Sequence, residues 1–217
     1  MTCYLRLHEI AVAVHAGTEG TDWDECIRLW RAAEGAGGRN LALDAMPVTA
    51  IDFDDLPTAD LSPFAGLVLA GRSDQVLLAD MRDKLRGFLD SGRVVVFSGQ
   101  VTHDWLPGAV AFEPGATADA ESGPPRLAEH PLFSGVSADD LGGSFLYPNG
   151  WHRPPPSAEV IVHRADGAPG AYLDRASTGG TVLLHSGANL LANATMKSSA
   201  ARIAPQLVEW VRRAENR

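Results

Sequence analysis

Residues 85–99 read LRGFLDSGRVVVFSG, and this stretch predicts the fold class of the chain. Its first half continues an apolar stripe with helical spacing, and Gly92 follows the last turn as a helix stop. Its second half, 94–97, is a run of Val and Phe that ends in Ser98 and Gly99, which is typical of a strand buried on both faces. A helix that leads directly into such a strand indicates a parallel sheet covered by helices.

The rest of the chain repeats this pattern. Three further apolar runs, at residues 9–15, 66–70 and 181–185, predict buried strands. The helix quoted above opens at Ser73 and Asp74, and its apolar stripe is formed by Leu77, Leu78, Met81, Leu85, Phe88 and Leu89. A strand, a helix and a strand of this length form a right-handed crossover, and such crossovers build a parallel sheet with helices on both faces.

Two other segments have helical spacing. One follows the first strand, begins at Thr21 or Asp22, and has the apolar residues Trp23, Cys26, Ile27, Trp30 and Ala33. The other lies near the end of the sequence and has the apolar residues Ile203, Leu207, Trp210, Val211 and Ala214. Because Pro205 interrupts the second pattern, that helix either begins at this proline or is kinked by it.

The middle of the chain is irregular. Residues 107–126 are rich in Gly, Pro and Ala, which indicates a long surface loop. Residues 149–157 contain three consecutive prolines, which indicate a rigid turn. Short strands are predicted at 143–147 and 158–163, as an antiparallel extension of the sheet. We therefore expect a single domain over the whole length, with an irregular insertion at about 107–157.

The composition fits one globular domain and excludes several classes of protein. The 217 residues include 27 acidic and 18 basic side chains, a net charge of −9, and 45% are hydrophobic. Without a basic cluster, neither nucleic acid nor an anionic membrane is expected as a partner. The apolar stretch 10–16 follows His8 and Glu9, where a signal peptide carries positive charge, and no stretch reaches bilayer length. We expect a soluble, cytoplasmic protein.

The two cysteines carry little chemistry by themselves. Cys3 and Cys26 allow at most one bridge, and their spacing matches no metal or redox pair. Cys26 lies on the apolar side of its predicted helix, which is typical of a small buried thiol.

The residues that come just after the predicted strands are polar. Ligands of open parallel sheets bind at the carboxyl ends of the strands, so these residues are candidates for a site that holds a small anionic or hydroxyl-rich ligand. The candidate ligand-binding residues are His15, Ser73, Ser98, Gly99, Gln100, His103, His152, His185 and Asn189. The structural alternative, for each single histidine, is that its polar edge finds water or backbone at a strand end.

Metal and nucleophile motifs are weak in this set. No pair among His15, His103, Asp104, His152 and His185 has the close helical spacing of metal ligands, so we expect no metal and no cofactor. A serine elbow at Ser98 needs glycines two residues before and after, but Val96 and Gln100 stand there.

Five segments, taken in their order and spacing, carry a resemblance to a known family. They are 10–17 with the following Asp22 and Trp23, 61–71, 85–99, HPLFSGV at 130–136, and 180–189. Together they resemble the class I glutamine amidotransferase-like superfamily. The resemblance is to its divergent branch, which includes trehalose-utilisation type proteins and the amidotransferase-like domains of sugar hydrolases. It implies an α/β fold: a flavodoxin-like three-layer sandwich with a mostly parallel central sheet and a short antiparallel extension.

The resemblance also implies where an active site would lie, and there this sequence departs from it. Working members carry Gly-X-Cys-X-Gly at the turn after the strand 94–97, and a His and Glu pair near the end of the chain. Aligning Gly99 with the second glycine places Phe97 at the position of the cysteine, and His185 has no Glu two residues later. Because Phe cannot be acylated, glutamine hydrolysis through a thioester is not expected.

Three functional hypotheses follow. The first is a catalytically degenerate domain that binds a small ligand or a protein partner at the carboxyl edge of the sheet. The second is a hydrolase or isomerase of a small sugar or amide, with Ser98 or a strand-end histidine as base and Asp22, Asp74 or Asp104 as its carboxylate partner. The third is a subunit of a larger assembly, such as a homodimer, anchored by the surface aromatics Trp105, Trp151 and Trp210.

Overall fold

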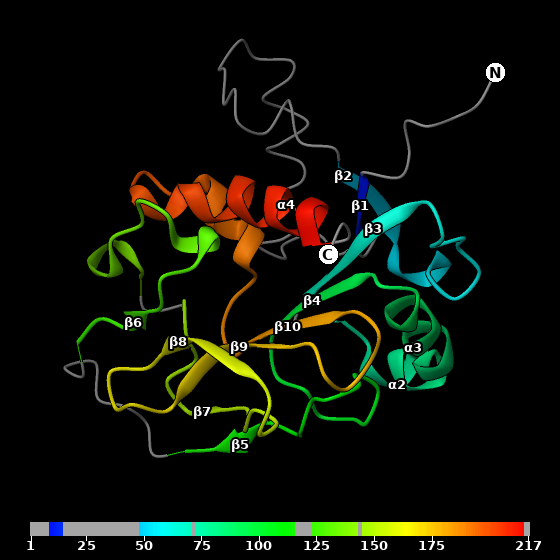
Figure 1. Cartoon of the computed structure of the whole chain (residues 1–217), viewed down its shortest axis with the longest axis horizontal. Helices are drawn as coiled ribbons and strands as arrows, with labels where there is room; N and C mark the ends of the chain where they lie inside the picture. The colour runs from blue at the N-terminus through cyan, green and yellow to red at the C-terminus, as the bar shows by residue number, and fades with distance from the viewer. Residues whose placement is uncertain (1–8, 15–47, 71–72, 116–122, 143–144, 215–217) are drawn as a thin grey trace, which may run out of the picture.

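A computed structural model of the chain describes residues 9–14, 48–70, 73–115, 123–142 and 145–214. Eight strands of this part form one mixed sheet with the order β2-β1-β3-β4-β10-β9-β8-β6 (Figure 1). They are β1 (Glu9–Val14), β2 (Val48–Asp52), β3 (Phe64–Ala70), β4 (Val94–Ser98), β6 (Arg126–Leu127), β8 (Glu159–His163), β9 (Pro169–Asp174) and β10 (Thr181–His185). A separate two-stranded sheet pairs β5 (Glu113–Pro114) with β7 (Gly150–Trp151).

The parallel half of the sheet confirms the four strands predicted from apolar runs. β1, β3, β4 and β10 occupy those runs, and β2 adds a parallel edge strand next to β1. The sequence pattern missed β2 because VTAID is short and mixes polar with apolar residues.

The other half of the sheet is antiparallel. The strand predicted at 158–163 is β8, whereas residues 145–147 of the strand predicted at 143–147 are irregular. β9 was not predicted, because its first residues are Pro169 and Gly170 and read as a turn. The expected antiparallel extension therefore exists and is built from β9, β8 and β6.

The helix predicted before β4 consists of two consecutive helices, α2 (Gln75–Asp80) and α3 (Arg82–Asp90). The Asp74 carboxylate caps α2 by accepting hydrogen bonds from the N–H groups of Val76 at 2.9 Å and Leu77 at 3.2 Å. Met81 lies between the two helices and has non-helical backbone angles.

The last helix, α4 (Ile203–Ala214), settles the role of Pro205. The helix begins at Ile203, after a 3₁₀ turn over Ser199–Arg202, so Pro205 lies in its first turn, where a helix needs no N–H donor. The helix predicted from Trp23 lies outside the described residues. No helix within the described ranges is long and apolar enough to cross a bilayer.

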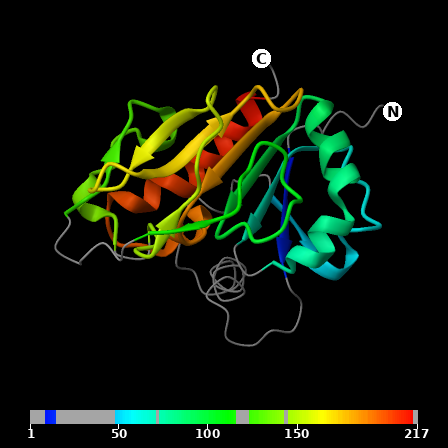
Figure 2. The ribbon, with the colours of Figure 1, turned by 90° about the horizontal axis from the view of Figure 1, so that it is seen from below.

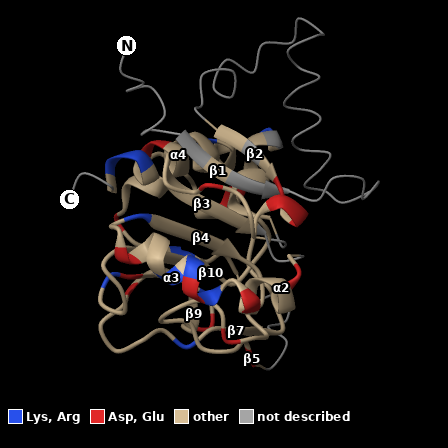
Figure 3. Cartoon of the chain, turned by 90° about the vertical axis from the view of Figure 1, so that its right-hand side faces the viewer, with Lys and Arg blue, Asp and Glu red and all other residues tan. Residues whose placement is uncertain are grey.

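Helices cover both faces of the sheet (Figure 2). Val94 and Val96 of β4 pack on the side of α4, together with Leu207 and Val211 of that helix. Val95 and Phe97 point to the opposite side, where α2 and α3 pack. This alternation is why the strand reads as a continuous apolar run: both of its faces are buried. Acidic and basic residues are interspersed on the side of the molecule that Figure 3 presents.

α4 packs tightly against the sheet at Gly66 of β3. A Cβ atom there would lie 2.4 Å from Cγ1 of Val211 and 3.1 Å from the carbonyl oxygen of Val94. The absence of a side chain at Gly66 therefore leaves the room that Val211 of α4 occupies.

We expect Gly66→Ala to lower the free energy of unfolding by about 1–3 kcal/mol, because α4 must move away from β3. Adding Val211→Ala should recover part of that loss, with a coupling energy of at least about 0.5 kcal/mol in urea unfolding. Gly87→Ala is the control: nothing lies within 4 Å of its Cβ, and in α3 it should stabilise by about 0.5–1 kcal/mol. A loss at Gly66→Ala that Val211→Ala does not reduce would contradict this account.

Candidate functional site

The structure brings Ser98 and His185 together at the carboxyl ends of β4 and β10. The two residues are register partners in the parallel ladder, so their side chains point to the same face of the sheet, the face of α4. Both are fully buried, with 0% exposure. The Gly99 N–H donates to the carbonyl of His185 at 3.0 Å and extends the pairing beyond the strand.

Ser98 has a structural partner. Its Oγ accepts a hydrogen bond from the N–H of Leu190 at 3.3 Å, at the start of the 3₁₀ segment Leu190–Thr195. Asn189 caps the same segment, since its Oδ1 accepts from the N–H of Leu191 at 3.0 Å. No imidazole among the described residues is hydrogen-bonded to the Ser98 hydroxyl, so none is in place as a base to activate it.

His152 bridges the chain segments that follow β4 and β10. Its Nε2 accepts from the N–H of Val101 at 3.0 Å, and its Nδ1 lies 2.7 Å from Oγ of Ser186. Since a backbone N–H can only donate, Nε2 is unprotonated, and in the neutral ring the proton is on Nδ1 and is donated to Ser186. His152 therefore cannot take a proton from Ser186. Burial lowers the pKa of His152 to about 4, which keeps the ring neutral.

His185 is buried without partners. Neither ring nitrogen makes a hydrogen bond, and the ring lies 4.8 Å from that of Phe145. Burial lowers the pKa of His185 to about 3; the backbone of Ala188 acts in the opposite direction, as does that of Phe145, and the nearby His152 adds to the lowering. The Nδ2 of Asn189 is also buried and unpaired. A buried polar group without a partner costs about 1–3 kcal/mol, so these groups mark a place for a further partner.

The loop after β4 is held by Gln75, which the sequence analysis did not single out. Its Nε2 donates to the carbonyl of Gln100 at 2.5 Å, and its Oε1 accepts from the N–H of Thr102 at 2.7 Å and from Nε1 of Trp105 at 3.1 Å. These partners lie 25 to 30 residues away in sequence, so no local pattern reveals the contact.

The remaining candidates lie farther out. His103 is exposed, and its Nδ1 lies 3.0 Å from Oγ1 of Thr102. Ser73 is half-buried just before α2. His15 lies outside the described residues.

The carboxylates suggested as partners of a catalytic histidine are engaged elsewhere. Asp104 pairs with Arg82 at 2.8 Å, and Asp74 caps α2. Asp22 lies outside the described residues. In the described ranges, no three His, Cys, Asp or Glu side chains gather in a way that could hold a metal ion.

The prediction that three tryptophans are surface anchors is wrong for Trp105. This side chain is 0% exposed and packs edge-on against Phe97 at 5.1 Å, because the loop after β4 folds back onto the apolar face of the sheet. Trp151 and Trp210 are half-buried; the first lies 5.8 Å from the guanidinium of Arg164 and the second 5.7 Å from His130.

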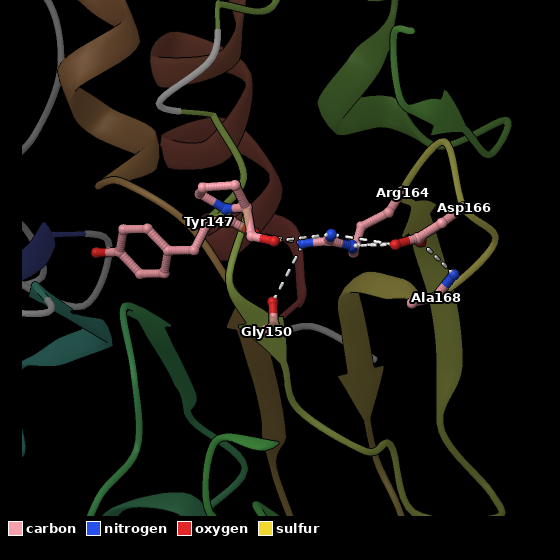
Figure 4. Close-up of polar contacts among 6 residues, drawn as sticks. Tyr147, Gly150, Arg164, Asp166 and Ala168 are labelled. Carbon is pink, nitrogen blue, oxygen red and sulfur yellow. Dashed lines mark hydrogen bonds and ion pairs between the residues drawn. The ribbon is translucent and has the colours of Figure 1, made fainter. Parts of the chain in front are cut away.

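Arg164 is a buried cation that the sequence analysis also missed. Its guanidinium donates to the carbonyl oxygens of Tyr147, Pro148 (3.1 Å) and Gly150 (3.3 Å), and it forms a 3.1 Å ion pair with Asp166 (Figure 4). Burial alone would raise the pKa of Asp166, but hydrogen bonds from Arg164 and the Ala168 N–H lower it. The arginine thus fixes the chain that crosses the carboxyl ends of β4 and β10.

Comparisons with known proteins give similarity of fold only. No model of a protein family matches the sequence, and no curated protein matches it. A β-galactosidase from Bacillus circulans sp. alkalophilus is similar in structure, with a TM-score of 0.50, 10% identity, and coverage of 95% of this chain and 31% of that chain. The chain thus spans about a third of that enzyme.

Two further structures match over nearly their full length. A ThuA-like protein from Bacteroides uniformis has a TM-score of 0.46 and 12% identity, covering 97% of this chain and 94% of that chain. A glutamine amidotransferase from Methylobacillus flagellatus has a TM-score of 0.43 and 14% identity, covering 96% and 93%. At such identities, function does not transfer with the fold.

The buried, neutral His152 predicts acid sensitivity. Between pH 6.5 and about 4 the unfolded chain binds a proton that folded His152 does not, so stability falls as pH decreases through this window. His152 contributes up to about 3 kcal/mol to this loss of unfolding free energy. In urea unfolding at pH 4–7, His152→Phe should reduce the slope of unfolding free energy against pH by up to about 1.4 kcal/mol per pH unit. An unchanged slope would show that the pKa of His152 is the same in the folded and the unfolded chain, which would contradict this account.

Proposed function

We propose that this chain is a catalytically degenerate domain of the class I glutamine amidotransferase-like, flavodoxin-like three-layer type. In this proposal it binds a small ligand or a protein partner at the carboxyl edge of its sheet. The observation that carries the proposal is the side chain of Phe97. It is 0% exposed and points to the α2 and α3 face, away from Ser98 and His185, where it packs against Trp105.

The position of Phe97 argues against thioester chemistry in two ways. An apolar ring offers no nucleophile, and its direction into the core means that a thiol at this position would also be enclosed by apolar side chains. Ser98, the next residue, has its Oγ bonded to the N–H of Leu190, and no imidazole of the described residues is hydrogen-bonded to it as a base.

The unpaired donors at the end of β10 support binding at this edge. His185 and Asn189 present neutral groups, and no Lys or Arg among the described residues is hydrogen-bonded to either side chain. Burying an anion without a compensating charge is costly, so these groups favour an uncharged ligand that bears hydroxyl or carboxamide groups over an anionic one.

The competing hypothesis of a hydrolase or isomerase lacks a supporting observation. His152 has the tautomer that cannot act as a base toward Ser186, and Asp74 and Asp104 are bonded to other groups. The similarity to part of a β-galactosidase supports the fold and carries no argument for its activity.

Partners and location belong to the same proposal. A net charge of −9 supports a partner other than nucleic acid or an anionic membrane. The proposal also includes a cytoplasmic location and a homodimer. Sedimentation or light scattering of the full chain tests whether the chain forms a dimer.

Glutamine hydrolysis is the direct test of the degenerate site. We expect no glutamate release from L-glutamine by the full chain, and no covalent adduct with a glutamine-analogue diazoketone in intact-mass measurement. Phe97→Cys should not restore turnover, because the thiol would face the core. Turnover by either protein, or an adduct mapped to Ser98, would contradict the proposal.

Ligand binding is tested with a matched pair of amide substitutions. Asn189→Asp keeps the oxygen that caps the Leu191 N–H but removes the unpaired Nδ2 group of Asn189 and leaves His185 in place, whereas the Nδ2 of Asn193 already donates to the carbonyl of Leu190 at 3.0 Å. In titrations followed by ¹H–¹⁵N spectra, we expect D-glucose or acetamide, and not phosphate, to shift resonances around His185.

Asn189→Asp should weaken that binding by about tenfold, as expected for one lost hydrogen bond in a buried site, and Asn193→Asp should leave the affinity unchanged. Binding of phosphate alone would contradict an uncharged ligand, and the absence of any shift would contradict the small-ligand part of the proposal.

A further inference from the structure

Residues 145–152, here called the cover, lie across the end of β10. The Tyr147 N–H donates to the carbonyl of Ser186 at 2.8 Å. A Cβ atom on Gly187 would lie 1.8 Å from the carbonyl oxygen of Phe145, so the two backbones touch where the glycine leaves room. The Phe145 ring lies against His185, which is 0% exposed beneath it. The unpaired imidazole is therefore enclosed by the cover.

The middle of the cover is fixed by charge-assisted bonds. Arg164 donates to three of its carbonyl groups, at Tyr147, Pro148 and Gly150, and is itself held by Asp166 on the turn between β8 and β9 (Figure 4). Its side chain is only 5% exposed. Such bonds are stronger than bonds between neutral groups, so the cover and this turn form one unit.

The contact of the cover with β10 is of a different kind. Ser186 accepts at its carbonyl from Tyr147 and, at its Oγ, from the backbone N–H of His152 at 3.2 Å and from the ring Nδ1 at 2.7 Å. The Nε2 of the same ring joins the cover to Val101 after β4. Every one of these bonds is between neutral groups. The His152 ring is bonded to the segments after both strands, to Val101 after β4 and to Ser186 after β10.

We propose that the cover is a hinged element, anchored by Arg164 and by the pairing of β7 with β5 and latched by His152, and that release of the latch exposes His185. This inference rests on the proposed function, since it names how a ligand would reach the unpaired donors. It predicts that opening is local: the cover leaves Ser186 while β4 and β10 stay paired.

The test uses amide hydrogen exchange of the full chain, measured by NMR, in His152→Phe and in Ser186→Ala. The diagnostic amide is that of Tyr147, whose acceptor, the Ser186 carbonyl, neither substitution removes. We expect its protection factor to fall by at least about tenfold in both variants, because each loses neutral bonds of the latch. The amides of Val95 and Leu183, in the centres of β4 and β10, should keep their protection relative to global stability.

His130→Phe is the matched control. The Nδ1 of His130 accepts from the Leu132 N–H at 3.2 Å, and its ring packs near Phe133 and Trp210, so the variant also removes a histidine-to-backbone bond but lies outside the cover. Its Tyr147 amide should exchange as in the wild type. A uniform fall in protection across β4 and β10 in His152→Phe and Ser186→Ala, or no change at Tyr147, overturns the latch.

Exposure of His185 is measured separately, by its rate of modification with diethyl pyrocarbonate, which acylates neutral imidazole. Peptide mapping should show His185 unreactive in the wild type and in His130→Phe, and reactive in His152→Phe and Ser186→Ala, with exposed His103 modified in every protein as internal standard. If the Tyr147 amide exchanges faster while His185 remains unmodified, the proposal that the cover controls access to His185 is overturned. Amide exchange and His185 modification are both measured without a ligand. If the latch behaves as expected but neither D-glucose, acetamide nor phosphate binds, only the proposed function is contradicted.

Discussion

The parallel pairing of β4 with β10 is the contact on which the rest of the molecule depends. It joins Val94–Ser98 to Thr181–His185, two strands from opposite halves of the chain, and it is where the parallel part of the sheet meets the antiparallel part. Because both faces of these strands are buried, their ends carry polar groups into a region that water does not reach. Every donor and acceptor there must find a partner within the protein or a bound molecule.

Three histidines, two at these strand ends and the half-buried His130 outside them, show how differently an imidazole is paired in this fold. His152 uses both ring nitrogens, His130 uses Nδ1 to accept from a backbone N–H, and His185 uses neither. Burial lowers the pKa of each. The same residue type therefore serves as a bridge between strand ends, as a cap of a 3₁₀ turn, and as an unpaired group that marks the candidate site. What separates them is the set of backbone groups that the fold places around each ring.

Local pattern was sufficient for elements whose residues carry a clear period. The apolar runs located β1, β3, β4 and β10, and the stripe from Leu77 to Leu89 located α2 and α3. It failed where an element is stabilised mainly by its neighbours: β9 begins with Pro169 and Gly170 but is completed by pairing with β10 and β8. The buried Trp105 is a similar case, since a tryptophan in a loop reads as a surface residue until the loop is known to fold onto the sheet.

By itself, the sequence determined that β4 ends without a cysteine at the turn where the resemblance requires one, because residue identity is a local property. Through its apolar periodicity it also determined where the strands β1, β3, β4 and β10 and the helices α2 and α3 lie along the chain. Only the tertiary structure decided which face of the sheet Phe97 and Ser98 each point to, and that Gln75 and Arg164 hold the surrounding loops. It also decided that His152 is hydrogen-bonded while His185 is not. The reason is physical: His152 contacts Val101 and Ser186, which lie 51 and 34 residues away, and hydrogen bonds over such separations leave no period in the sequence.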